Sequence, residues 1–127
     1  MQIIDKYGYL ESALDYIERY LVSGRGLHSI AKKARINEDL VKNLSLALNN
    51  FSEKKFLSLI QEKIEDKHSS IPGADIEISE VDISIETEKN KALILMNLGC
   101  DIVIDNEKED KIKLEIKIFS KNNIQIK

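Results

Sequence analysis

The basic and amide side chains between Arg25 and Asn49 are the residues whose types and spacing could do chemistry. From residue 20 to 55 the chain carries seven Lys or Arg against three acids, a local net charge of +4, whereas the whole chain has a formal net charge of -3. Lysine and arginine can bind nucleic-acid phosphates, and asparagine can read the edge of adenine. The candidate nucleic-acid-binding residues are Arg25, Lys32, Lys33, Arg35, Asn37, Lys42, Asn43 and Asn49. A solvated helix surface explains so short a basic segment equally well.

Catalytic and metal-binding chemistry finds little support in the other polar residues. His28 and His68 are far apart in the sequence and lack the spacing of paired metal ligands. Cys100, the single cysteine, falls in an apolar row of alternating residues, which predicts an inert buried thiol. We therefore predict a protein that is not an enzyme and has no cofactor. Four tyrosines could stack on bases, but their helical spacing favours core packing: Tyr7, Tyr9, Tyr16 and Tyr20.

The first half of the sequence has the apolar spacing of helices. Apolar residues recur at steps of three and four from Leu10 to Leu21, and a short second helix is expected from about Leu27 to Ala34. Asn37 is expected to cap a third helix, because its side-chain oxygen can accept hydrogen bonds from unpaired N–H groups of the first turn. A fourth helix is expected from about Glu53 to Glu65.

The second half has the period of two that is typical of strands. The apolar residues change from even to odd positions near Ser79, which predicts a bulge there, because an uninterrupted strand cannot switch faces. A turn is expected at residues 88–91, followed by an unbroken apolar row on even positions from Ala92 to Ile104. These features predict an antiparallel β-meander with one apolar face.

Together the two halves predict an α+β fold. Residues 1–68 would form an N-terminal bundle of three to four helices with a helix-turn-helix-like unit, residues 69–74 a linker, and residues 75–127 an antiparallel sheet of three to four strands. Either the helices cover the apolar face of the sheet, or a second copy does so in a dimer. Leu93 and Leu95 put apolar groups on the other face too, which favours a covered second surface.

The segment from Leu27 to Leu46 has the apolar positions of two short crossing helices. Ala31 supplies a small side chain where the helices would cross, and Ile36 closes the turn between them. The other positions expected to face inward are Ile30, Ala34, Val41 and Leu44. This pattern resembles the helix-turn-helix superfamily motif, over about a sixth of the chain. The resemblance implies that the second helix of the pair meets duplex DNA.

Four positions depart from that motif or fit it poorly. Arg35 stands where the motif commonly has glycine, at a turn position that favours positive φ, and this costs on the order of 1 kcal/mol. Glu38 and Asp39 would face phosphates that repel them, although they also favour the helix dipole and could accept from cytosine. Leu46 shares the outward side of Lys42, so we expect the sheet or a partner chain to cover it.

These patterns lead to two functional hypotheses. The first is a small cytoplasmic nucleic-acid-binding protein, a helix-turn-helix transcriptional regulator of duplex DNA whose sheet supports a homodimer or a protein partner. The alternative is a non-catalytic interaction protein, or a small subunit of a larger, even nucleoprotein, assembly, with its partner interface at Leu46, Leu93 and Leu95. No apolar run is long enough to span a bilayer and no secretory signal is visible, so we expect no membrane partner.

Overall fold

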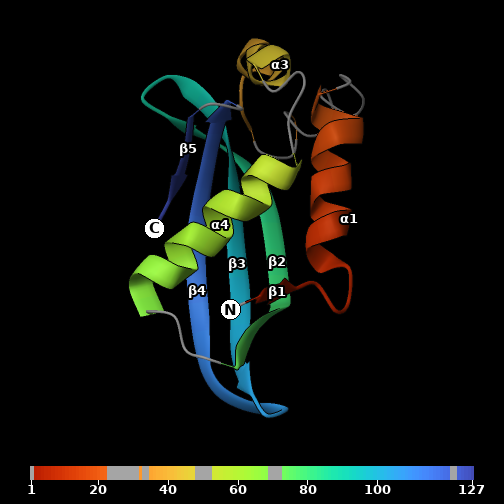
Figure 1. Cartoon of the computed structure of the whole chain (residues 1–127). Coiled ribbons are helices and arrows are strands. Elements are labelled where there is room, and N and C mark those ends of the chain that lie inside the picture. The colour runs from red at the N-terminus through yellow and green to blue at the C-terminus, as the bar shows by residue number, and fades with distance from the viewer. Residues whose placement is uncertain (1, 23–31, 33–34, 48–52, 69–72, 121–122) are drawn as a thin grey trace.

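A five-stranded sheet with helices on one face organises the chain (Figure 1). The structure is a computed structural model that describes residues 2–22, 32, 35–47, 53–68, 73–120 and 123–127. The elements in chain order are β1 (Gln2–Ile4), α1 (Tyr9–Tyr16), its π-helical continuation η1 (Ile17–Val22), α3 (Glu38–Ala47), α4 (Glu53–His68), β2 (Ala74–Glu88), β3 (Lys91–Ile104), β4 (Glu107–Ser120) and β5 (Asn123–Ile126).

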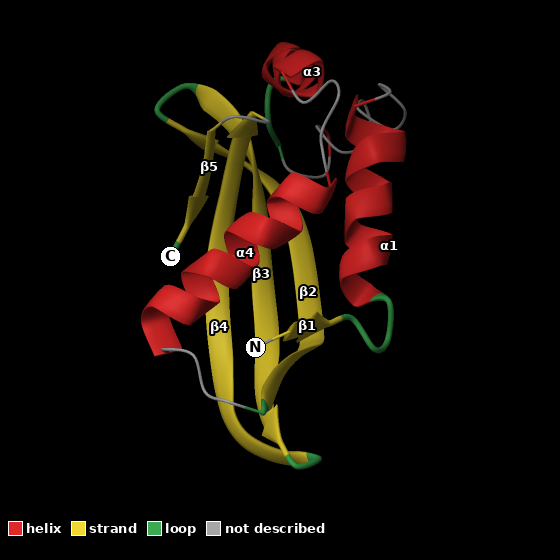
Figure 2. Ribbon diagram, viewed as in Figure 1, coloured by secondary structure: helices red, strands yellow, loops and turns green. Residues whose placement is uncertain are grey.

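The strands lie side by side in the order β1-β2-β3-β4-β5. β1 pairs with β2 in parallel, and the other three pairings are antiparallel. Two-residue turns with positive φ join the long strands: Lys89 and Asn90 have φ of 50° and 63°, and Asp105 and Asn106 have φ of 51° and 65°. Such turns match the right-handed twist of the strands they join, and the sheet curls strongly (Figure 2).

The predicted bulge in β2 is confirmed. Ile78 lies opposite Cys100, but the next paired residue, Glu80, lies opposite Gly99, so Ser79 is an extra residue. Because of this extra residue, Ile76 and Ile78 before the bulge share a face of the sheet with Val81, Ile83 and Ile85 after it. The bulge thus keeps every apolar residue of β2 on the side of the helices.

One core lies between that side of the sheet and the described helices. Phe56, Ile60 and Ile64 place the apolar stripe of α4 across the strands (Figure 2). α1 with η1 contributes Leu10, Ala13, Leu14 and Ile17, and α3 contributes Val41 and Leu44. The even-numbered residues of β3 and β4 form the floor: Ala92, Ile94, Met96, Leu98, Cys100, Ile102, Ile112, Leu114, Ile116 and Ile118.

The expectation of an N-terminal bundle of three to four helices is wrong. In the described part of the chain, α1, α3 and α4 lie on the sheet rather than around one another, because the apolar face of the long strands offers them a larger surface to bury. The sheet also has five strands rather than three or four. β1 was missed because three residues are too short to show an alternating pattern, and its partner lies more than seventy residues away.

Candidate functional site

The face of the sheet opposite the helices, here called the bare face, carries charged side chains sorted by strand. β2 presents acids and β4 presents mostly lysines, while β3 between them is largely uncharged. None of the described helices lies on this face (Figure 1). Its charged residues on β2 are Asp75, Glu77, Glu80, Asp82, Glu86 and Glu88, and those on β4 and after β5 are Lys108, Lys111, Lys113, Glu115, Lys117 and Lys127.

A cleft of about 460 Å³ lies in the middle of the bare face. Two neighbouring rows of cross-strand residues build it: Asp82, Asn97 and Glu115 in one row, and Glu80, Gly99 and Lys113 in the next. Lys127, whose backbone pairs with that of Glu115, also lines it, so the cleft holds three carboxylates, two ammonium groups and one amide. Such a set can bind a charged or strongly polar partner group.

Gly99 and the bulge together position Glu80 over the floor of the cleft. A Cβ atom at residue 99 would lie 3.3 Å from Cβ of Glu80 and 3.6 Å from its Oε2, so the side chain of Glu80 occupies the space that glycine leaves. The hydroxyl of Ser79 donates to the carbonyl oxygen of Gly99 at 3.2 Å and fastens the bulge to β3. A larger residue at position 99 would push the carboxylate away.

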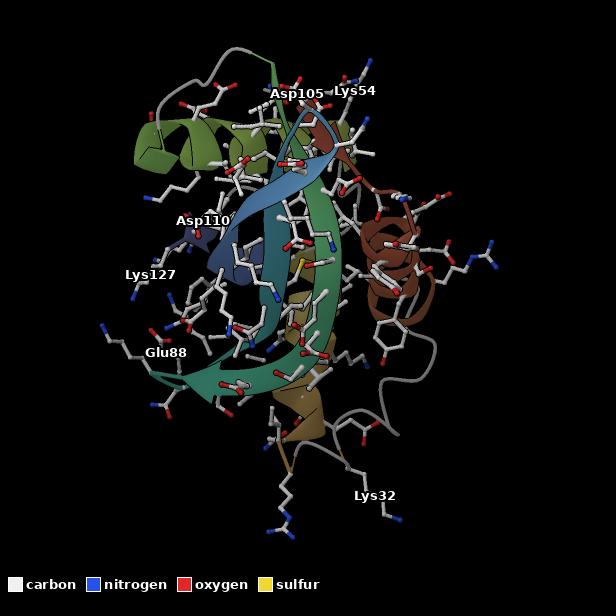
Figure 3. All side chains as sticks on the ribbon, turned by 90° about the horizontal axis from the view of Figure 1, so that it is seen from below. Lys32, Lys54, Glu88, Asp105, Asp110 and Lys127 are labelled. Atoms are coloured by element: carbon white, nitrogen blue, oxygen red, sulfur yellow. The ribbon has the colours of Figure 1, made fainter. Side chains whose placement is uncertain are left out.

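An ion pair crosses the bare face near the β2–β3 turn. Lys117 Nζ lies 2.6 Å from Glu88 Oε2. Lys117 is opposite Leu95 and Glu88 is opposite Lys91, so the pair passes over the row of Leu93, which is only 2% exposed. The hydrogen bond with Lys117 lowers the pKa of Glu88, and the same bond raises the pKa of Lys117. Figure 3 places Glu88 on the same side of the molecule as Lys127.

We expect this ion pair to make stability depend on pH. Because the folded protein lowers the pKa of Glu88, its contribution is present above the ordinary carboxyl pKa and is lost as the pH falls through the lowered value. The raised pKa of Lys117 gives the opposite limit: its contribution is lost as the pH rises through that value. Urea unfolding of wild type and Glu88→Gln, from acidic to neutral pH, should give midpoints that converge in acid. A difference between the midpoints of wild type and Glu88→Gln that stays constant with pH contradicts this assignment. So does a control variant, Glu109→Gln, whose midpoint converges with that of wild type in the same way.

Asp101 is a buried carboxylate on β3 beside Gly99, on the same face. It is 3% exposed; its Oδ2 lies 3.3 Å from Lys108 Nζ, and its Oδ1 has no hydrogen-bond partner among the described residues. On the other face, burial raises the pKa of the Cys100 thiol to about 12, and the charge of Asp101 contributes. The predicted burial of Cys100 is confirmed.

The predicted turn before α3 is present. Arg35 has φ of 55°, as expected for a position that favours glycine, and its N–H donates to the carbonyl oxygen of Lys32 at 3.3 Å. Asn37 caps α3, because its Oδ1 accepts from the N–H of Asp39 at 2.8 Å. The Asn37 cap is therefore confirmed.

The candidate nucleic-acid-binding residues are only partly brought together. Lys32, Arg35, Asn37 and Lys42 are exposed near the start of α3, and Lys32 points away from the rest of the molecule (Figure 3). Asn43, the expected base reader, lines a groove of about 210 Å³ between α3 and the β2–β3 turn, so the sheet is beside it. The other candidates, Arg25, Lys33 and Asn49, lie outside the described residues.

The three candidate interface leucines lie in different environments. Leu46 on α3 is 70% exposed, Leu95 is half-buried, and Leu93 is already buried within one copy of the chain. Sequence reasoning did not find the sorting of charge on the bare face. The signal was present, because acids alternate along β2 and lysines along β4, but it has meaning only once the pairing of the strands is known.

The expectation that the tyrosines pack in the core is wrong for those with described side chains. Tyr7 is 63% exposed and its ring centroid lies 5.4 Å from that of Tyr9. Tyr9 and Tyr16 are exposed as well, because Leu10 and Leu14 occupy the side of α1 that faces the sheet. The side chain of Tyr20 is not among those that the structure describes.

Comparisons with known proteins give no further guidance: no protein-family model matches the chain, and no curated protein or solved structure is significantly similar to it. In the described part of the chain no helix is long and apolar enough to cross a membrane. Within the same residues no three His, Cys, Asp or Glu side chains gather to hold a metal ion.

Proposed function

We propose that this chain is a non-catalytic interaction protein that binds another protein chain through the bare face of its sheet. The observation that carries the proposal is the charge-sorted bare face with its cleft of about 460 Å³. Antiparallel sheets often leave one face to water, but scattered charges of both signs suffice for that. An acidic strand and a basic strand on one face instead make a negative patch beside a positive patch. A partner with the complementary arrangement of charge is favoured over other partners.

The test compares two triple variants with the same change in charge. The first neutralises the cleft with Glu80→Gln, Asp82→Asn and Lys113→Gln. The control neutralises exposed charges of α4 with Glu62→Gln, Asp66→Asn and Lys54→Gln. Both are used with wild type in chemical crosslinking and affinity purification from the source cells. Wild type and control should hold the same partner in a fixed stoichiometry, and the cleft variant should lose it. Partner binding that survives in the cleft variant, or no stoichiometric partner of any chain, contradicts the proposal.

Nucleic-acid binding is the second candidate, and the turn before α3 favours it. The positive φ of Arg35 and the Asn37 cap agree with the turn of the helix-turn-helix motif, and Lys42 is exposed beside them. Against it, Glu38 and Asp39 are exposed at the same helix end, and Asn43 lies beside the sheet. A transcriptional regulator of this type would contact phosphates through these cations.

A salt titration of affinity tests this second candidate on duplex DNA, single-stranded DNA and RNA. Each phosphate contact contributes about 0.9 to the slope of log affinity against log salt concentration for duplex DNA. We expect the variant Lys32→Ala, Arg35→Ala, Lys42→Ala to lower the slope by about three such contributions. Lys6→Ala with Lys111→Ala, two exposed lysines near the opposite end of the sheet, serves as control. Absent binding, or binding without salt dependence, removes this candidate.

A further inference from the structure

We infer that the partner on the bare face is a second copy of this chain, packed face to face about a two-fold axis parallel to β3. The inference rests on the proposed function, because it names the occupant of the same face. It starts from the charge difference between the strands that flank β3. On the bare face, β2 carries six acids and no base, whereas β4 carries four lysines and one acid.

The direction of the two-fold axis decides which charges meet. An axis parallel to β3 in the interface plane places β2 of one copy over β4 of the other. The acidic strand of each copy then faces the basic strand of its partner, and this happens twice. An axis across the strands in the same plane instead places β2 over β2 and β4 over β4, so that like charges meet. Like charges that face each other across an interface are unfavourable, and the first arrangement avoids them along most of β2 and β4, whereas the second brings them together along both strands.

The strand register shows which residues would be opposite each other. Glu77, Asp101 and Lys111 form one row across β2, β3 and β4, and Glu80, Gly99 and Lys113 form the next row. An axis along β3 keeps each row in place and exchanges its two ends. Glu77 of one copy then faces Lys111 of the other, and Glu80 faces Lys113. The two-fold operation gives four such pairs in total.

The middle of the face suits a contact between sheets. Two packed sheets lie about 10 Å apart, so the side chains of the central strand meet the same strand of the other copy. On β3 these are the half-buried Leu95 and Val103, together with Asn97 and Gly99. Asp101 and Lys91 lie on the same face of β3 and would also face their counterparts, but the buried Asp101 is paired with Lys108 of its own copy and Lys91 lies at the end of the strand. The charged strands lie at the margins, where interfaces are polar. One row is unfavourable, because Asp82 would face Glu115, but Lys127 pairs with Glu115 through the backbone and brings a positive charge to that row.

A charge-swap experiment tests the inference. Variant A carries Lys111→Glu and Lys113→Glu, so β2 and β4 are both acidic in the rows of Asp101 and Gly99. Variant B carries Glu77→Lys and Glu80→Lys, so β2 and β4 are both basic in these same two rows. Analytical ultracentrifugation should find wild type in a monomer–dimer equilibrium that weakens as salt is added. Each variant alone should dimerise at least about tenfold more weakly than wild type. An equimolar mixture should recover the dimer, because the A–B pair restores all four opposite-charge contacts.

Recovery on mixing separates the inference from misfolding, since a damaged fold would not be repaired by a second damaged chain. Circular dichroism of each variant provides the fold control. A wild type that remains monomeric at low salt, variants that dimerise as tightly as wild type, or a mixture that stays monomeric would each overturn the two-fold dimer. A different protein captured by the bare face in the crosslinking test would then still support the proposed interaction function. If the bare face binds neither a second copy nor a different protein, both the two-fold dimer and the proposed interaction function are removed.

Discussion

Replacing Phe56 with alanine should lower the free energy of unfolding by about 3–5 kcal/mol, the range measured for removing large buried aromatic side chains. Phe56 is 0% exposed and anchors α4 on the sheet with Ile60 and Ile64. Its truncation removes apolar contact and leaves a cavity that neighbouring side chains fill only in part. Because small domains are stable by only about 5–15 kcal/mol, much of the protein should unfold at modest urea concentration.

Tyr7→Ala is the matched control for this prediction. It also shortens an aromatic side chain to a methyl group, but at a position that is 63% exposed. We expect it to cost about 1 kcal/mol or less, since it removes only exposed contacts with the Tyr9 ring and the Lys6 ammonium group. Urea unfolding followed by circular dichroism measures both variants. Equal losses for Phe56→Ala and Tyr7→Ala would show that α4 does not form the cover of the sheet.

Leu93→Ala should destabilise a single copy of the chain by about 2–5 kcal/mol, although Leu93 lies on the face away from the helices. It is 2% exposed, beneath the ion pair of Lys117 with Glu88. Those two side chains meet over β3, so the leucine is buried without any partner chain. Its removal should therefore act on folding rather than on assembly alone.

Leu46→Ala makes the same change at a position that is 70% exposed, and we expect it to alter stability by less than about 0.5 kcal/mol. The measurement is the urea midpoint at two protein concentrations. For Leu93→Ala the loss relative to wild type should be the same at both concentrations, because it arises within one copy. A loss that disappears on dilution would instead assign Leu93 to an interface between copies.

Local features of the fold could be read from the sequence where one short-range rule controls them. Alternation of apolar residues located the bulge at Ser79 and the buried row of β3, and a single side chain defined the cap of α3 at Asn37. Arg35 adopted the positive φ that its place in the turn required. These features depend on residues within a few positions, so they do not need knowledge of the whole fold.

Long-range pairing could not be read in the same way. Helical spacing shows which side of α1 is apolar, but it does not say whether that side meets another helix or a sheet, and the bundle was chosen wrongly. The candidate site had the same difficulty. Glu80 and Lys113 are 33 positions apart in the sequence and line one cleft only because both pair with Gly99. From the sequence, Leu93 likewise looks like an interface residue. The ion pair that covers it joins β2 to β4, and this pairing cannot be seen in the sequence.

The parallel pairing of β1 with β2 has a consequence for how the chain folds as it is made. Gln2 pairs with Asp75, so this contact forms only after all three described helices have left the ribosome. Until then the apolar sides of those helices have no sheet to cover them. Contacts between distant parts of a chain slow folding, and exposed apolar surface invites aggregation. The apolar sides of these helices therefore stay available for other contacts until the long strands emerge.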